Sequence, residues 1–292
     1  MNGHRRQGPP QSGPARELIE SGFAIENEDA PFLHAGLNLA DLAHVLDLRR
    51  RGIVPEDAAR ALLELLLEVH QMPVEDFPYD PAYGEPYNSR EHYFVSRLGD
   101  VAGWMHAGRP RREAARIAMR LHLRRQLLAL VTEVVAFAET LTTRAGEHLD
   151  TVMPDQTYLQ QAQPSTFAHY LLSFVYPALR DADRMIDELG WVNASPGGAG
   201  CVNGTRLQDD RTHVARALGF DGIIVNTRDA MWQVDGLIHI LAAGASMLSN
   251  FSKLGEDLEI WSSSEFDFVD LADSYSRASV LMPNKRNPYS LS

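Results

Sequence analysis

The sequence contains little cysteine and almost no lysine. Among its 292 residues Cys201 is the only cysteine, so no internal disulfide can form, and free thiols are typical of cytosolic proteins. Of the 27 basic residues only Lys253 and Lys285 are lysines. A lysine retained in an arginine-biased chain indicates a position where a compact ammonium differs in function from a guanidinium. The single cysteine therefore predicts a cytoplasmic protein, and the scarcity of lysine makes Lys285 a candidate functional residue.

Other absences exclude whole classes of protein. No run of about 18 uncharged apolar residues is present, which predicts that no helix spans a membrane, and Met1–Pro14 has no apolar stretch of a signal peptide. The net charge of −12 disfavours nonspecific binding to nucleic acid or anionic membranes. The 11 histidines show no His-x-x-x-His spacing, so we expect neither a metal nor another cofactor. The 45% apolar and 23% charged residues are typical of a globular chain.

Helical periodicity is the dominant pattern, and no useful β-alternation accompanies it, so the predicted fold class is all-α. Pro110–Leu149 is the longest helical segment and is free of glycine until Gly146. Roughly 40 helical residues would extend about 60 Å, which is typical of an elongated bundle or of subunit packing. The other expected helices lie near Leu39–Leu46, Glu56–His70, Thr166–Leu189, Asp209–Leu218 and Thr227–Trp261.

The predicted domain order follows these segments. We expect a disordered tail at 1–15, a helical domain at 16–109 and a long-helix bundle domain at 110–292. Asn287-Pro288 has the pattern of an N-cap followed by the first residue of a new helix, yet four residues follow that proline. The bundle is therefore expected to be incomplete, truncated before its last helices and a C-terminal domain.

Three polar segments interrupt the helices and are candidates for chemistry. In His106–Glu113, arginines cluster at the start of the long helix, where the unpaired N–H groups favour an anion. The alternative is a solvated basic turn neutralised by Glu113. Thr157–Pro164 offers a hydroxyl, a phenol and amides, but on composition alone it is an ordinary interhelical loop. Ser274–Asn287 places an apolar triplet between serines and a Lys-Arg-Asn cluster.

A glycine-rich turn at Gly197–Gly204 suggests a phosphate loop at first sight. It lacks the Gly-Lys-Ser/Thr ending and follows no predicted strand. We interpret it as a plain connection between helices, and Cys201 inside it as unreactive.

Several motifs occur together in an order and spacing that resemble a known family. They are Ser279-Val-Leu-Met-Pro-Asn-Lys-Arg-Asn-Pro288, Thr157-x-Leu-Gln-x-Ala-Gln-Pro164, Gly108-Arg-Pro-Arg111, Leu218-Gly-Phe-Asp221 and Leu254-x-Glu-Asp-Leu258 followed by Trp261-Ser-Ser. From about Asn38 onward the chain resembles the argininosuccinate lyase branch of the fumarase/aspartase superfamily. The resemblance implies mostly helical homotetramers, with each active site assembled from three subunits. It also implies cleavage of a C–N or C–O bond in a succinyl-type substrate with release of fumarate.

The resemblance assigns roles to single residues. Ser279 would be the general base on a mobile loop, and a serine needs its alkoxide stabilised by N–H groups and a cation to act so. Lys285 and Asn287 match the pair that stabilises the substrate carboxylate of the dianionic intermediate. Arg111 matches an arginine that holds the fumarate-side carboxylate.

Three further residues match substrate-contacting positions. Thr157 corresponds to a hydroxyl, His92 to a substrate-site histidine, and Gln163 to an amide of the second loop.

The chain also departs from the family pattern. Tyr158 stands where the catalytic histidine is usual, and Ser292 where its carboxylate partner is usual. Tyr158 could still protonate a leaving amine, although an unperturbed phenol with a pKa near 10 is a weak acid at neutral pH. Pro110 and Arg112 replace a serine and an asparagine that help hold the substrate, and Val234 occupies the place of an arginine.

Two functions from different classes follow. The first is a lyase, whole or represented here by a piece, that eliminates fumarate from argininosuccinate, an aminopolycarboxylate or a nitrosuccinate-type compound. The second is a catalytically degenerate paralogue that acts as a non-enzymatic helical oligomer, which Tyr158 and Ser292 favour.

Overall fold

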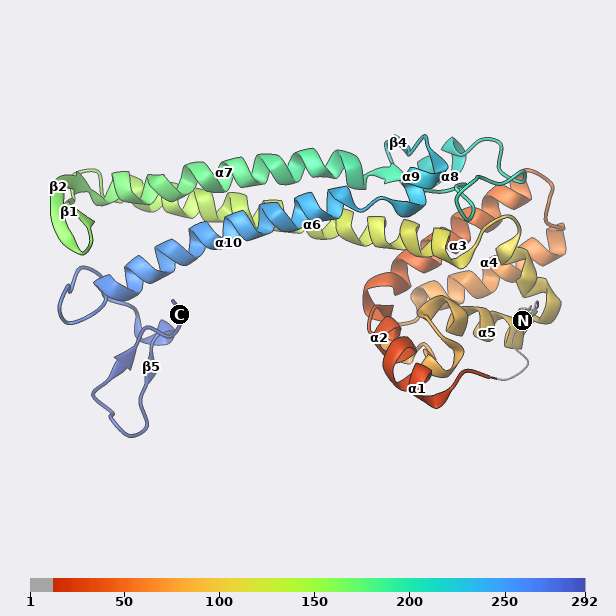
Figure 1. The fold of residues 1–292 in the computed structure, drawn as a ribbon, viewed down its shortest axis with the longest axis horizontal. Helices are drawn as coiled ribbons and strands as arrows, with labels where there is room; N and C mark the ends of the chain where they lie inside the picture. Colours follow the sequence, from red (N-terminus) through yellow and green to blue (C-terminus); the bar gives the residue numbers. More distant parts are fainter. Residues whose placement is uncertain (1–12, 292) are drawn as a thin grey trace, which may run out of the picture. The chain divides into compact units, whose positions relative to one another are not determined.

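The computed structural model describes residues 13–291, and the chain is mostly α-helical, which confirms the predicted fold class (Figure 1). It divides into two compact units, one comprising the chain up to Arg125 with Val192–Gln233, the other Gln126–Trp191 with Val234 onward. Each unit combines two separate stretches of the sequence, whereas the predicted domains at 16–109 and 110–292 are single stretches. Those domain boundaries stay a prediction. The disordered tail predicted at 1–15 lies, up to residue 12, outside the described residues, and a short helix begins at Arg16.

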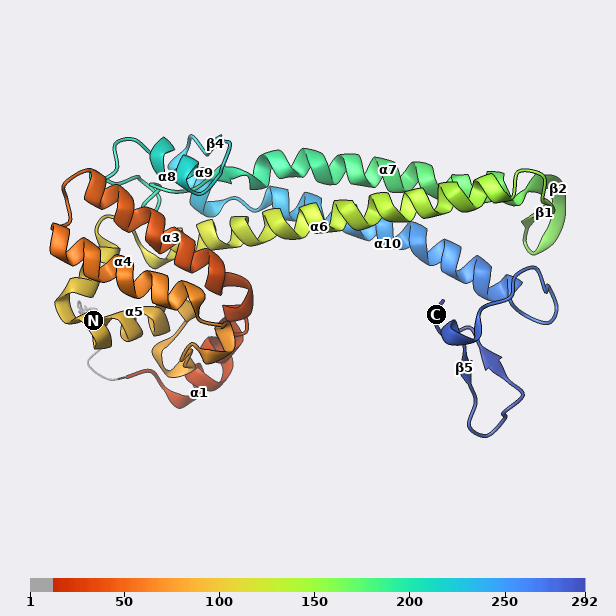
Figure 2. The same cartoon turned by 180° about the vertical axis from the view of Figure 1, so that it is seen from behind.

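The first unit is built around three helices that lie side by side in both views, α3 (Ala30–Arg50), α4 (Glu56–Gln71) and α5 (Pro86–Leu98) (Figures 1 and 2). It also contains the first part of α6 (Arg111–Glu147). Its shorter elements are α1 (Arg16–Leu18), a π-helical turn (Ile19–Phe23), α2 (Ala24–Asn27), 3-10 turns at Val74–Asp76, Pro81–Tyr83 and Gly99–His106, the parallel pair β3 (Ala194–Ser195) and β4 (Gly222–Ile223), α8 (Thr212–Ala217) and α9 (Thr227–Trp232).

A glycine lets α3 and α6 approach closely. A Cβ atom added at Gly36 would lie 2.6 Å from the Cα atom of Ala118, nearer than real Cβ atoms come. Around this contact Leu37, Ile117 and Leu121 are buried in one apolar cluster. The close contact fixes the start of α6 against α3.

A fully buried ionic network joins α3 to α5 and to the segment before α6. Asp41 accepts hydrogen bonds from Arg109, from Arg90 (Nη2 to Oδ2, 2.7 Å) and from the Tyr87 hydroxyl (2.9 Å). Arg90 also donates to Asn38 (2.6 Å), and Arg109 to the carbonyl of residue 40 (2.9 Å). Burial by itself would raise the pKa of Asp41, but the two guanidiniums outweigh it and hold this pKa below its usual range.

The second unit contains the rest of α6, α7 (Phe167–Val192) and α10 (Asp235–Trp261), between which lies a buried apolar cluster that includes Leu141, Phe174 and Leu254. Its other elements are the antiparallel hairpin β1 (Val152–Thr157) and β2 (Gln160–Thr166), a 3-10 turn (Asp273–Tyr275), and the short pair β5 (Arg277–Ala278) and β6 (Arg286–Asn287).

The hairpin replaces a segment that the sequence predicted to be an irregular loop. Its two-residue turn consists of Tyr158 and Leu159, with φ of 55° and 57°. Such turns usually carry asparagine, aspartate or glycine, so the local sequence gave no hairpin signal. Pro154 and Pro164 face each other in the ladder, which proline tolerates because both strands are edges.

One helix prediction was wrong. The helix expected over Thr227–Trp261 is broken between α9 and α10, where Gln233 is extended and Val234 has φ −133°. The break precedes a contact in which Gly236 lies against Trp191, where an added Cβ would be 2.1 Å from the indole. Asn287 pairs in β6, and the helix expected to begin at Pro288 stays a prediction, because only residues up to 291 are described.

One helix meets the length and composition of a membrane span, although the sequence contains no run of about 18 uncharged apolar residues. An 18-residue window of α6 is apolar enough, and 22% of that window is buried within this chain. Length and composition do not distinguish such a helix from one that packs in a bundle.

We predict that Gly36→Ala destabilises the protein although alanine is the better helix former. The new methyl group must push α3 away from Ala118, and overpacking of this kind costs about 1–3 kcal/mol. Chemical unfolding of this variant should give a lower free energy of unfolding than that of the unsubstituted chain. As a control, Gly146→Ala in α6 meets no atom within 4 Å and should be neutral or stabilising by up to about 1 kcal/mol; the same sign for both variants would contradict this explanation.

We predict that Asp41→Asn lowers the free energy of unfolding by about 3–5 kcal/mol at neutral pH, because two guanidiniums stay buried without their counter-charge. The folded-state pKa of Asp41 is depressed, so its stabilisation is present above the unfolded-state pKa and lost as pH falls through the folded-state value. Urea unfolding over a range of pH should therefore show the two proteins converging in acid. Glu64→Gln, at an exposed site on α4, serves as control, and a loss below about 1 kcal/mol for Asp41→Asn would disprove the role of the network.

Candidate active site

Arg111 and His92 are linked through two intermediate residues of the first unit. Arg111, the first residue of α6, forms an ion pair with Glu85 and donates from Nη1 to the Asn88 side chain (3.2 Å). Asn88 donates in turn to the carbonyl of Tyr83 (2.9 Å), whose ring stacks on His92 with centroids 4.0 Å apart. The structure thus brings both predicted substrate-binding residues to one place beside the N-terminal half of α5.

The segment that presents Arg111 is rigidly held from both sides. Arg109 belongs to the buried network, so one of the clustered arginines is structural and cannot meet a ligand. Glu113 is also buried and accepts hydrogen bonds from the amides of Gly198 (2.8 Å) and Gly200 (2.6 Å). Burial raises the pKa of Glu113, and the two N–H groups partly oppose that rise.

The position of Glu113 therefore bears on two segments, the basic turn before α6 and the glycine-rich turn. It does not neutralise a solvated basic turn, because its carboxylate is turned into the protein; the carboxylate beside Arg111 is Glu85. The glycine-rich turn is a connection, as predicted, and two of its amides are already occupied by Glu113. Cys201 in this turn is exposed.

The β1–β2 hairpin carries Thr157, Tyr158 and Gln163, and all three side chains are exposed. Thr157 ends β1, and Gln163 pairs with Asp155 across the ladder. Tyr158 is 99% exposed and has the left-handed backbone conformation that side chains other than glycine rarely adopt. Two-residue hairpin turns of this kind require positive φ at both positions, and residues other than glycine held in such a conformation cluster at active sites and ligand clamps.

The loop between β5 and β6 carries the second set of predicted catalytic residues. The Ser279 amide donates to the carbonyl of Lys285 (3.3 Å), and the Ser279 hydroxyl accepts from the Met282 amide (3.2 Å). Arg286 anchors the loop through Asp273 (Nη2 to Oδ1, 3.0 Å). At the tip Val280 and Leu281 are exposed. An N–H group directed at a serine oxygen is the kind of donor that stabilises a developing alkoxide.

The predicted residues therefore fall into separate groups. Ser279, Lys285 and Asn287 share one loop, and the hairpin residues share another element. No hydrogen bond between the hairpin and this loop occurs in the described part of the second unit. Ser292 lies outside the described residues, and Val234 is an exposed residue directly before α10.

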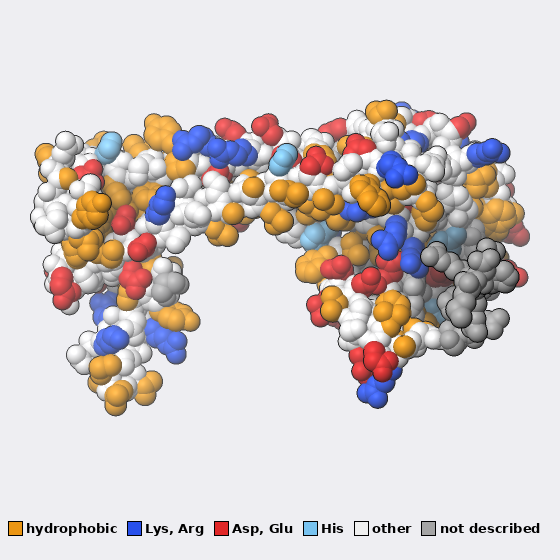
Figure 3. All heavy atoms as spheres, in the orientation of Figure 1, with side chains coloured by type: hydrophobic (Ala, Val, Ile, Leu, Met, Phe, Trp, Pro, Cys, Tyr) orange, Lys and Arg blue, Asp and Glu red, His pale blue; other side chains and the backbone are white. Residues whose placement is uncertain are grey.

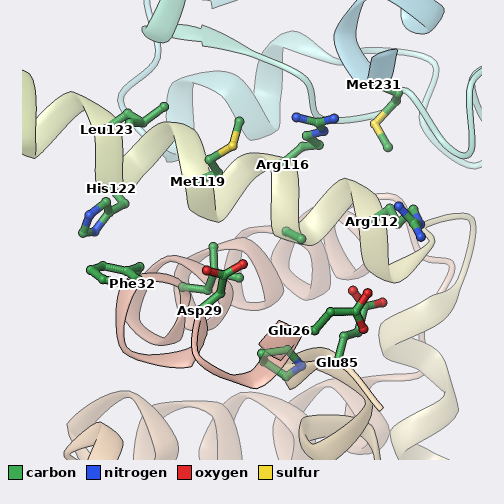
Figure 4. Close-up of a pocket in the computed structure, with 13 residues that line it drawn as sticks. Glu26, Asp29, Phe32, Glu85, Arg112, Arg116, Met119, His122, Leu123 and Met231 are labelled. Carbon is green, nitrogen blue, oxygen red and sulfur yellow. The ribbon is translucent and has the colours of Figure 1, made fainter. Parts of the chain in front are cut away.

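Sequence patterns missed several polar residues around Arg111. Tyr83 ends a 3-10 turn, Glu85 directly precedes α5 and Asn88 lies in its first turn, and no sequence motif marks these residues. Glu85 also lines a cleft of about 480 Å³ in the first unit, together with Arg112 and Arg116 of α6 (Figure 4). Among residues 13–291, no group of three or more His, Cys, Asp or Glu side chains could hold a metal ion.

We predict that Glu85→Gln tightens the binding of a simple dicarboxylate such as succinate about twofold to fivefold, because the internal competitor for Arg111 is removed. Titration calorimetry would measure the Kd. Glu91→Gln, on α5 and paired with His106 rather than Arg111, should leave the Kd unchanged. Weaker binding by Glu85→Gln would contradict the idea that Glu85 competes for the guanidinium.

Comparison with known proteins places this chain among lyases. A family model described as "Lyase" matches residues 56–292. The argininosuccinate lyase of Methanococcoides burtonii is 37% identical over 284 residues, covering 97% of this chain and 57% of the relative. That of Oceanobacillus iheyensis is 38% identical, covering 94% and 60%. The chain therefore spans somewhat more than half the length of these relatives.

Solved structures agree on the fold. The crystal structure of EDDS lyase in complex with formate matches with a TM-score of 0.83 and 30% identity, covering 96% of this chain and 56% of that one. Class II fumarase from Schistosoma mansoni matches with a TM-score of 0.76 at 14% identity, a likeness of fold alone.

Proposed function

This chain belongs to the lyase family, as an argininosuccinate lyase-like member of the fumarase/aspartase superfamily, and on that premise we propose that it is part of a C–N lyase. The reaction is β-elimination from a substituted succinate with release of fumarate. The observation that carries the proposal is the β5–β6 loop, in which Ser279, Lys285 and Asn287 lie together and an amide is directed at the serine oxygen.

The loop provides what proton abstraction needs. The proton to be removed lies on the carbon next to a carboxylate, and its loss places a second negative charge on that carboxylate. Ser279 takes the proton, with its alkoxide stabilised by the Met282 amide and by the cation of Lys285. Lys285 and Asn287 stabilise the doubly charged carboxylate, and Arg111 holds the other. The C–N bond then breaks, its electrons pass to the nitrogen, and a carbon–carbon double bond forms.

The departing amine must also receive a proton. Tyr158 is the proposed donor, because the left-handed turn holds its phenol fully outward at the position of the usual histidine. Thr157 and Gln163, on the same hairpin, and His92 contact the substrate.

The active site is proposed to require several copies of the chain. The groups of site residues lie on separate elements, and helices of the second unit expose large apolar side chains, including Leu128, Tyr176, Ile238 and Leu241 (Figure 3). A homotetramer with shared active sites would cover these faces and explain the membrane-like window of α6 without a membrane. The proposed partners are then a small dicarboxylate substrate and further copies of the chain in the cytoplasm, without nucleic acid, membrane or cofactor.

The substrate is proposed to be argininosuccinate-like or another N-succinyl or aminopolycarboxylate compound. The relatives named argininosuccinate lyase favour the first, while EDDS lyase, together with Arg112 and Pro110 at substrate-holding positions, favours the wider class. A degenerate, non-enzymatic oligomer is the second candidate, and the loss of the histidine at Tyr158 favours it.

The deciding experiment is Ser279→Ala in the protein that carries this chain. With succinyl amines as substrates and fumarate absorbance as the readout, we expect the unsubstituted protein to be active. Loss of the base should lower kcat/KM by about three orders of magnitude or more. Ser21→Ala, an exposed serine outside all three candidate segments, should keep full activity. No fumarate from any substrate, or equal rates in both variants, would favour the degenerate oligomer.

A further inference from the structure

The cleft beside the start of α6 has two walls of opposite charge. Its α6 wall carries Arg112 and Arg116, and the facing wall carries Glu26, Asp29 and Glu85 (Figure 4). Apolar side chains lie between and beyond them, contributed by Phe32, Leu33, Met119, Leu123 and Met231. The cleft of about 480 Å³ lies within the first unit alone, so it does not depend on how the units are arranged.

The two arginines of the α6 wall are not neutralised by the protein. Within residues 13–291, neither Arg112 nor Arg116 has a carboxylate oxygen within 4.0 Å. They are one helical turn apart, where two like charges repel each other. Arg116 is half-buried, and burial together with Arg112 lowers its pKa. Figure 4 shows the Arg116 guanidinium pointing toward Met231 and away from Asp29. This arrangement leaves guanidinium donors available to an anion.

Two acidic side chains of the facing wall are likewise not neutralised by an ion pair. Glu85 is engaged by Arg111, but Glu26 and Asp29 form no ion pair in the described part of the chain. Besides Glu85, two carboxylates and two guanidiniums therefore line the cleft, together with apolar side chains. A ligand that carries only negative charge would meet repulsion from Glu26 and Asp29, whereas one that also carries an ammonium would satisfy both walls.

We propose that this cleft binds an aminopolycarboxylate, with its carboxylates at Arg112 and Arg116 and its protonated nitrogen toward Glu26 and Asp29. Identification of this ligand as the amine half of the substrate rests on the proposed lyase function. Glu85 connects the two regions, because it lines the cleft and also contacts Arg111.

Two isosteric ligands test the charge pattern directly. Iminodiacetate and glutarate are dicarboxylates of equal length that differ in the central group, an amine in the first and a methylene in the second. In metal-free buffer, titration calorimetry should show that the chain binds iminodiacetate about tenfold more tightly than glutarate. Equal affinity for iminodiacetate and glutarate would overturn the role of the acidic wall.

Variants separate the two walls. Arg116→Met should weaken both dicarboxylates about tenfold, whereas Arg60→Met, an exposed arginine on α4 with a single distant carboxylate partner at 3.8 Å, should change neither. The double variant Glu26→Gln with Asp29→Asn should remove the preference for iminodiacetate and leave glutarate binding intact or improved. This double variant keeps the test decisive if Arg116→Met does not fold. Affinities unchanged by substitution of either wall would overturn the proposal.

The same variants distinguish failure of the cleft from failure of the lyase. Binding is measured without turnover. If iminodiacetate binding depends on Arg116 in a protein that forms no fumarate, the cleft is a binding site but its role in binding the substrate is rejected. In an active protein, the reverse addition of amine to fumarate should show a KM for the amine raised about tenfold by Arg116→Met, with the KM for fumarate unchanged. An active enzyme with both KM values unchanged would reject the cleft and leave the lyase standing.

Discussion

Asp41 and the two guanidiniums around it are the constraint on which the first unit depends. A buried carboxylate is tolerable because Arg90, Arg109 and Tyr87 satisfy its oxygens. Arg109 lies two positions before Arg111, so the pair with Asp41 also fixes where α6 begins and where the next arginine side chains emerge. On the other side Glu113 ties the same segment to the glycine-rich turn. Between Arg109 and Glu113, buried charged residues with a structural role thus alternate with charged residues that can contact a ligand.

That alternation explains why similar side chains have different duties. Arg109 is buried and neutralised, Arg111 is exposed and paired with Glu85, and Arg112 faces the cleft. Solvation decides the difference, because a guanidinium withdrawn from water needs a permanent counter-charge whereas one at the surface can exchange its partner for a ligand. The same principle separates Glu113 from Glu26 and Asp29 on the facing wall.

The second unit shows which elements local sequence patterns predict and which they do not. The periodicity that predicted α7 and the long α6 is a property of the chain itself, because an apolar stripe at helical spacing must be buried somewhere. The hairpin gave no such signal, since Tyr158 and Leu159 are unusual turn residues and the strands are too polar for alternation. The break before α10 was also invisible, because it accompanies the packing of Gly236 on Trp191.

The sequence by itself determined the helical class, the family and most of the proposed site residues, because motif order and helical periodicity are encoded in consecutive positions. Only the tertiary structure decided which charges are free. Glu113 meets its glycine amides 85 and 87 positions away, and Arg109 meets Asp41 68 positions away. Glu85, with no motif to mark it, meets Arg111. Of these pairings, that of Arg109 with Asp41 accompanies the close contact of α3 and α6 at Gly36 and Ala118. A contact between distant segments is not encoded in the residues adjacent to either partner.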